Sequence, residues 1–152
     1  MSREYPDRPI VGAGAVIIDQ GRVLLVKRAR PPLLGHWSVP GGMVELGETV
    51  RAATEREALE ETGLAVKVGE VLDVFDGITP GKNGLPQYHY VLVDFLCERV
   101  GGELRAGGDA ADVAWVREDE LEKYRVEGLT LAVVRKAFSL SRSRIENRKS
   151  LG

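Results

Sequence analysis

Charged residues near the middle of the chain have the types and spacing that metal-ion chemistry requires. The run REALEE at residues 56–61 places three carboxylates at i, i+3 and i+4, namely Glu57, Glu60 and Glu61. On a helix these side chains share one face, so their negative charges repel one another. Carboxylate oxygens are ligands of Mg²⁺ and Mn²⁺, and such a cation offsets the repulsion. The pattern favours a divalent-cation site, with a solvated acidic face and an Arg56–Glu60 ion pair as the alternative.

The segment that carries these glutamates is predicted to be one helix. Thr49 is a suitable N-cap, and Gly63 is placed where a left-handed residue ends a helix. Residues 50–61 contain no Pro or Gly and include several good helix formers. We expect a narrow buried stripe on the side opposite the acidic face, made of Ala52, Leu59 and Thr62.

The rest of the chain is predicted to supply a sheet around that helix. Runs rich in Val and Ile, or with alternating apolar residues, predict strands at residues 10–19, 22–28, 64–76, 88–99 and 113–116. Gln20-Gly21 suits a tight reversal between the first two strands, and Gly69 suits a bend within the third. Gly12 and Gly14 in the first strand indicate close packing against its backbone, either by a ligand or by a helix.

Loops and helices are predicted between and after these strands. Polar, Gly-containing runs predict loops at residues 76–86 and 101–112, and Trp37 is expected to anchor the loop at 29–40 onto the core. A short helix is predicted at 117–124 and a longer one at 130–140, with a frayed tail at 141–152. With no repeat or linker in the sequence, residues 1–152 are expected to form a single α/β domain with one mixed sheet flanked by helices.

Composition excludes several classes of function. The 21 basic and 23 acidic residues nearly balance, so a nucleic-acid or membrane-surface partner is not expected. No apolar run reaches the length of a membrane span and no signal segment is recognisable, so we expect a cytoplasmic protein. Cys97 is the only cysteine and lies in an apolar run, which predicts a buried, inert thiol. Neither His36 nor His89 has a partner at zinc-ligand spacing.

The pattern around the glutamates resembles the Nudix box, G-x5-E-x7-R-E-U-x-E-E-x-G-U, in which U is aliphatic. Gly42 is followed by MVELG and Glu48, then by TVRAATE and the run REALEETGL at 56–64. Every fixed position matches, and only Ala58 is small for an aliphatic position. The chain is therefore identified by resemblance as a Nudix hydrolase, most similar to the ADP-ribose pyrophosphatase-like members. The resemblance implies an α/β/α sandwich with a mixed sheet.

The resemblance also implies a metal site that holds Mg²⁺ or Mn²⁺. By similarity, the ligands are the carboxylates of Glu57, Glu60 and Glu61 with the backbone carbonyl of Gly41. Divalent cations neutralise the charge of a pyrophosphate and can activate a water for attack on phosphorus. Arg56 is then expected to orient the carboxylates by pairing with Glu48 or Glu57.

The catalytic set implied by the resemblance is Glu57, Glu60, Arg56 and a general base outside the box. Asp109, in the Gly-rich loop before Trp115, is favoured as that base. Asp112 and Glu103 in the same loop remain alternatives, and in some family members the base is the box glutamate at the position of Glu57.

The substrate implied is a nucleoside diphosphate linked to another group, and ADP-ribose cleaved to AMP and ribose 5-phosphate is favoured. Pro80 lies sixteen residues beyond Leu64, a position where ADP-ribose pyrophosphatases commonly have proline. The alternatives are pyrophosphate release from an oxidised nucleoside triphosphate and a catalytically silent nucleotide-binding module. Family likeness also suggests a homodimer. Candidate substrate contacts are Arg28, Lys82 and Tyr88, with Tyr90 beside them.

Overall fold

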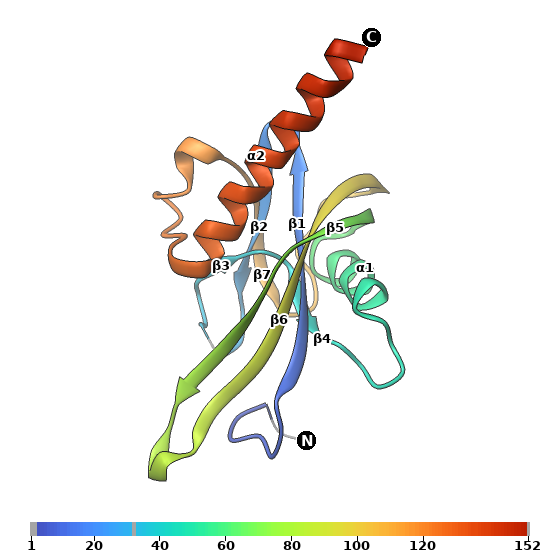
Figure 1. Cartoon of the computed structure of the whole chain (residues 1–152). Helices are drawn as coiled ribbons and strands as arrows, with labels where there is room; N and C mark the ends of the chain where they lie inside the picture. The colour runs from blue at the N-terminus through green and yellow to red at the C-terminus, as the bar shows by residue number, and fades with distance from the viewer. Residues whose placement is uncertain (1–2, 32, 152) are drawn as a thin grey trace.

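The computed structural model describes residues 3–31 and 33–151 (Figure 1). The strands are β1 (Ile10–Asp19), β2 (Arg22–Arg28), β3 (Trp37–Ser38), β4 (Gly41–Met43), β5 (Leu64–Pro80), β6 (Pro86–Gly102) and β7 (Ala110–Arg117). The α-helices are α1 (Val50–Thr62) and α2 (Gly128–Leu151), and short 3₁₀ turns occur at Lys82–Gly84 and Glu118–Glu120. None of the helices in these two ranges is long and apolar enough to cross a membrane.

The strands form a mixed seven-stranded sheet in the order β3-β2-β1-β6-β5, with β4 beside β1 and β7 beside β2. β1 runs parallel to β6 and antiparallel to its other neighbours. It pairs with β4 at residues 12–14 but with β2 only at residues 18–19. β4 and β2 therefore pair with successive stretches of the same edge of β1. Of these two strands, β4 is the one that reaches the candidate site.

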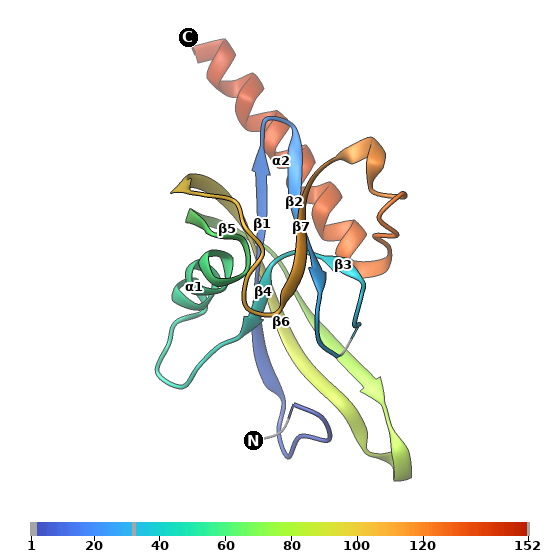
Figure 2. The ribbon, with the colours of Figure 1, turned by 180° about the vertical axis from the view of Figure 1, so that it is seen from behind.

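The two helices cover opposite faces of this sheet (Figures 1 and 2). Because side chains alternate along a strand, Val16 packs in the cluster on the α2 side while Ala15 and Ile17 pack in the cluster on the α1 side. Phe95 and Leu96 on β6 divide in the same way. This arrangement confirms the expected α/β/α sandwich, and Trp37 packs against the α2-side cluster as predicted.

The β5–β6 hairpin is longer than the sequence indicated. The predicted loop at 76–86 is wrong in most of its length, because β5 continues to Pro80 and β6 begins at Pro86. The reversal is confined to residues 81–85, where Asn83 and Gly84 both have positive φ, the conformation that tight turns require. Figure 1 shows this hairpin extending beyond the rest of the sheet. At Gly69 the pairing register shifts, which confirms the predicted bend.

The C-terminal helix also continues beyond its predicted end. The expectation of a frayed tail after residue 140 is wrong for the described residues, because α2 is helical through Leu151. No Pro or Gly interrupts residues 129–151. Arg142 pairs with Glu118, and Arg144 pairs with Glu70, so side-chain contacts hold the start of this extension. The predicted helix at 117–124 is instead a single 3₁₀ turn followed by hydrogen-bonded turns.

Cys97 is buried in the α1-side cluster, as predicted. The residue is 3% exposed, and burial raises the pKa of its thiol to about 12. The thiol therefore stays protonated at neutral pH, and its role is packing.

Candidate active site

The glutamate-bearing helix begins and ends as the sequence predicted. The Thr49 side chain accepts a hydrogen bond from the Ala52 backbone N–H at 3.0 Å. Gly63 ends the helix with a φ of 76°, and its N–H donates to the Leu59 carbonyl. These caps fix which turn of α1 lies against β4.

The buried face of α1 agrees with the predicted stripe only at Thr62. Ala52 and Leu59 are exposed, and Leu59 retains 54% of its accessible surface. The residues that are buried are Ala53, Thr54, Ala58, Glu61 and Thr62. Its hydrophobicity predicts that Leu59 is buried. Instead, part of the acidic face forms polar contacts with β4 and faces the sheet.

Glu61 is the most deeply buried of the three glutamates. Its carboxylate accepts a hydrogen bond from the Gly41 backbone N–H at 2.8 Å, and the residue is 3% exposed. Burial raises the pKa of Glu61 to about 7, although the bond from Gly41 opposes the shift. The structure thus brings Gly41 and Glu61 together through the amide of Gly41, whereas the prediction gave its carbonyl a role as metal ligand.

Glu57 lies directly against Gly42. A Cβ added to Gly42 would lie 2.5 Å from the carboxyl carbon of Glu57, closer than real Cβ contacts. Only glycine therefore fits beside this carboxylate. Burial raises the pKa of Glu57 above its usual value, against the opposing hydrogen bond from Arg56.

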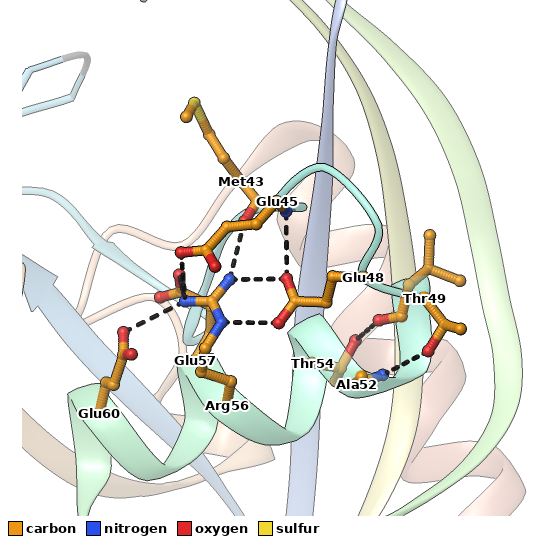
Figure 3. Close-up of polar contacts among 10 residues, drawn as sticks. Met43, Glu45, Glu48, Thr49, Ala52, Thr54, Arg56, Glu57 and Glu60 are labelled. Carbon is orange, nitrogen blue, oxygen red and sulfur yellow. Dashed lines mark hydrogen bonds and ion pairs between the residues drawn. The ribbon is translucent and has the colours of Figure 1, made fainter.

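Arg56 holds four oxygen-bearing groups together (Figure 3). Its Nε and one terminal nitrogen donate to the two oxygens of Glu48 at 2.8 and 2.9 Å. The guanidinium also donates to Glu57 at 2.8 Å, to the Met43 carbonyl at 3.0 Å and to Glu60 at 3.3 Å. The predicted pairing with Glu48 or Glu57 is confirmed, and it occurs with both. The hydrogen bonds from Arg56 lower the pKa of Glu48 to about 2.

The carboxylates fit a hard divalent cation unequally. Glu60 keeps 52% of its side chain exposed and turns toward Arg56. Across residues 3–31 and 33–151, no three acidic, histidine or cysteine side chains converge as a ready cluster. Glu57 and Glu61 nevertheless present oxygen donors beside Gly41 and Gly42, and burial disfavours their charged forms. A cation there would supply the missing positive charge, so this pair fits it better than Glu60 does.

A cavity of about 810 Å³ adjoins these glycines. Its wall includes Gly41 and Gly42 on β4, Gly12 and Gly14 on β1, and the start of α2. A Cβ on Gly12 would overlap the Leu92 side chain, and one on Gly14 would overlap Asp94. The close packing expected at these glycines therefore comes from β6 side chains that also line the cavity.

The predicted substrate contacts divide between the cavity and the hairpin tip. Arg28, Tyr88 and Tyr90 line the cavity, and the two tyrosine rings stack with centroids 6.4 Å apart. Lys82 does not line it, because the extended β5–β6 hairpin carries this residue to an exposed turn. The prediction that Lys82 joins the other contacts is therefore wrong within this chain. Pro80 also lies outside the cavity wall, at the end of β5.

Of the three loop carboxylates considered as a base, Asp109 alone lines the cavity among the described residues. It forms ion pairs with Arg30 at 3.1 Å and with Arg3 at 3.8 Å. Asp112 is exposed and caps the next backbone N–H, and Glu103 is exposed in the loop. The geometry therefore favours Asp109 over its two neighbours.

Sequence reasoning missed three charged residues of the cavity wall, namely Arg3, Asp76 and Asp94. Asp94 is the only charged residue between Tyr90 and Cys97, an interruption of an apolar strand that was a usable signal. Arg3 gave no signal, because it lies in a polar N-terminal run far from the motif.

A family model of the NUDIX domain matches residues 8–135. The chain belongs to the Nudix family. This match confirms the resemblance of residues 42–64 to the Nudix box and extends the similarity to most of the chain.

Relatives of this Nudix chain carry different names. It is 38% identical over 115 residues to an ADP-ribose pyrophosphatase of Methanocaldococcus jannaschii, covering 76% of this chain and 66% of that protein, just under two thirds. It is 42% identical over 113 residues to a Mycobacterium tuberculosis protein provisionally named 8-oxo-dGTP diphosphatase 2, covering 74% of this chain and 75% of the other. The crystal structure of a MutT NUDIX hydrolase from Burkholderia pseudomallei superposes with a TM-score of 0.70 at 36% identity, covering 88% and 98%.

Proposed function

We propose that this Nudix protein is a pyrophosphohydrolase that uses Mg²⁺ or Mn²⁺ to cleave ADP-ribose with water to AMP and ribose 5-phosphate. The observation that carries the proposal is the position of two carboxylates, Glu61 buried and Glu57 partly buried. Glu57 and Glu61 lie against Gly42 and Gly41, and these glycines form part of the wall of the cavity. A substrate in the cavity therefore places its phosphates beside the oxygen donors.

The residues of the candidate site have distinct proposed roles in pyrophosphate hydrolysis. A bound divalent cation supplies positive charge and lowers the pKa of a water. Glu57 and Glu61 would hold that cation, and Arg56 fixes the direction of Glu57 through its hydrogen bond. Asp109 and Arg28 line the cavity. Asp109 would accept the proton of an attacking water, and Arg28 would offer positive charge to a phosphate.

Two observations favour ADP-ribose as the substrate. The cavity has the size of sites that enclose small organic ligands, and its wall includes the stacked Tyr88 and Tyr90 rings, which suit contact with a base. The archaeal relative bears the name ADP-ribose pyrophosphatase. Pro80 adds no structural support, because it lies outside the wall. The mycobacterial relative's name supports a second candidate, cleavage of an oxidised nucleoside triphosphate.

A substrate panel tests the proposal. The protein would be incubated with Mg²⁺ and ADP-ribose, dATP or 8-oxo-dGTP, and the products separated by liquid chromatography. We expect AMP and ribose 5-phosphate, with a higher kcat/KM for ADP-ribose than for the triphosphates. A preference for 8-oxo-dGTP would establish the second candidate. Undiminished AMP release by Glu57→Gln and Glu61→Gln would refute the metal-ligand roles, and no turnover by the unaltered protein would favour a silent nucleotide-binding module.

We further propose that the protein acts as a homodimer in the cytoplasm. The long β5 strand leaves one edge of the sheet without a neighbour among the described residues, and Val74 and Ile78 on it are exposed. Light scattering would give the mass in solution, and a monomer at micromolar concentration would contradict the dimer.

A further inference from the structure

Asp94 is a buried carboxyl on the cavity wall that the proposed chemistry does not use. It lies in the middle of β6 and is 6% exposed. Beyond Gln87, the cavity-lining residues of β6 alternate along the strand, namely Tyr88, Tyr90, Leu92 and Asp94. Phe95 and Cys97, on the other face, pack toward α1. Asp94 therefore belongs to the same surface as the two stacked tyrosines.

Among the described residues, none provides a side-chain partner for this carboxyl. Within residues 3–31 and 33–151, no side-chain hydrogen bond or ion pair reaches Asp94, yet none of its oxygens is both fully buried and unpaired. Its oxygens therefore open into the cavity. The residue opposite it on β5 is Asp73, a like charge. Burial and this neighbour both raise the pKa of Asp94, to about 6. A buried carboxyl without a donor costs stability, so its presence needs a ligand to offset the cost.

The neighbouring strand leaves room for Asp94 next to the metal-binding region. Gly14 pairs with Asp94 across β1 and β6, and any Cβ on Gly14 would overlap the carboxyl. Gly14 also pairs with Gly41 on its other side. One strand therefore separates Asp94 from the glycine whose amide binds Glu61. A ligand with phosphates at Gly41 and its remaining part in the cavity comes within reach of Asp94.

We propose that Asp94 is a specificity residue that accepts a hydrogen bond from the exocyclic amino group of an adenine base in the cavity. This rests on the proposed function, which brings an adenine nucleotide to the same wall. A carboxylate accepts and does not donate, so it selects a base edge that carries an N–H donor. Hydrogen bonds to charged groups are stronger than those between neutral groups. This hydrogen bond is lost when the base has no amino group.

The direct test compares ADP-ribose with its analogue in which adenine is replaced by purine, which lacks only the amino group. For the unaltered protein we expect KM to be roughly tenfold higher with the analogue, with similar kcat. Asp94→Val, which removes the acceptor, should raise KM for ADP-ribose by a similar factor and lose the discrimination. Asp94→Asn retains a neutral acceptor and should fall between the two. Glu98→Gln is the matched control, because Glu98 is exposed on the same strand and lies outside the cavity wall.

Binding of AMP separates this inference from the catalytic proposal. Calorimetry with AMP and purine riboside monophosphate needs no turnover, so it reports on Asp94 even where ADP-ribose is not the preferred substrate. Tighter binding of AMP by the unaltered protein, lost in Asp94→Val, supports the inference. Equal binding of the two nucleotides, or discrimination that follows the ribose hydroxyls in 2′-deoxy and 3′-deoxy analogues instead, would overturn it. A fall in kcat alone for Asp94→Val would also overturn it.

Discussion

The carboxylate of Glu61 accepts a hydrogen bond from the backbone N–H of Gly41 at 2.8 Å, and this contact joins helix α1 to strand β4. It accounts for an unusual property of the helix, which buries an acidic residue and exposes Leu59. The same contact places the most buried carboxylate of the motif beside the cavity. The packing of α1 and the position of this candidate metal ligand therefore both depend on the hydrogen bond between Gly41 and Glu61.

Replacing Glu61 by glutamine should separate folding from activity. The glutamine carbonyl can still accept from the Gly41 amide, so the fold should be retained, and removing a buried acid should leave the melting temperature equal or higher in metal-free buffer. Loss of the charge should lower ADP-ribose hydrolysis by roughly a hundredfold or more, since loss of even an outer partner of a metal site costs about 10–100-fold. Thermal melts and initial rates check both. A variant as active as the unaltered protein would remove Glu61 from the site.

Adding one methyl group at Gly42 should impair activity more than stability. Its Cβ would lie 2.5 Å from the Glu57 carboxyl carbon, so Gly42→Ala must displace that carboxylate. Gly101→Ala is the matched control, because its Cβ meets only the Ala65 Cβ at 3.9 Å. We expect a large fall in kcat for the first variant and none for the second. Equal rates for both would mean that the position of Glu57 does not matter to the reaction.

Arg56→Lys should weaken metal binding while keeping the positive charge. Lysine lacks the planar fork with which Arg56 engages both oxygens of Glu48 while reaching Glu57. We expect Mn²⁺ affinity, followed by electron paramagnetic resonance, to fall by about 10–100-fold. Arg51→Lys serves as the control on the same helix, since Arg51 bonds to carbonyls near Gly69 and not to the glutamates. An equal loss in both variants would indicate a general effect on the helix.

The stability of the protein should show the cost of Asp94. Its pKa is about 6 in the fold against 3.8 for the free side chain. The folded state therefore holds a proton that the unfolded state has lost, and the stability contributed by this group falls as pH rises from about 4 to above 6. At pH 8, Asp94→Asn should gain up to about 3 kcal/mol of unfolding free energy, and the gain should vanish near pH 4. Denaturant titrations at both pH values measure it; an equal gain at both would mean that folding does not raise the pKa of Asp94.

The sequence predicted best what is local along the chain. Residues 49–63 contain their own caps and spacing, so α1 and the pairing of Arg56 were predictable. The cavity wall was not, because Gly14 and Asp94 meet only through the parallel pairing of β1 with β6. Lys82 was placed wrongly because the Gly- and Pro-rich composition of residues 76–86 predicted a loop where β5 continues to Pro80. The buried face of α1 was also not predictable, because helix periodicity does not show which face has polar partners on a neighbouring strand.

The alternation of side chains along β6 has a consequence for how such proteins diverge. Even-numbered positions from Tyr88 to Asp94 line the cavity, whereas odd-numbered neighbours such as Phe95 pack beneath the glutamate-bearing helix. Exchanges at even positions can redesign the pocket without disturbing the hydrolytic centre, but a one-residue insertion in the strand would exchange the two sets. A combinatorial library confined to four alternating codons of β6 is therefore a compact way to retarget this enzyme scaffold to another nucleotide.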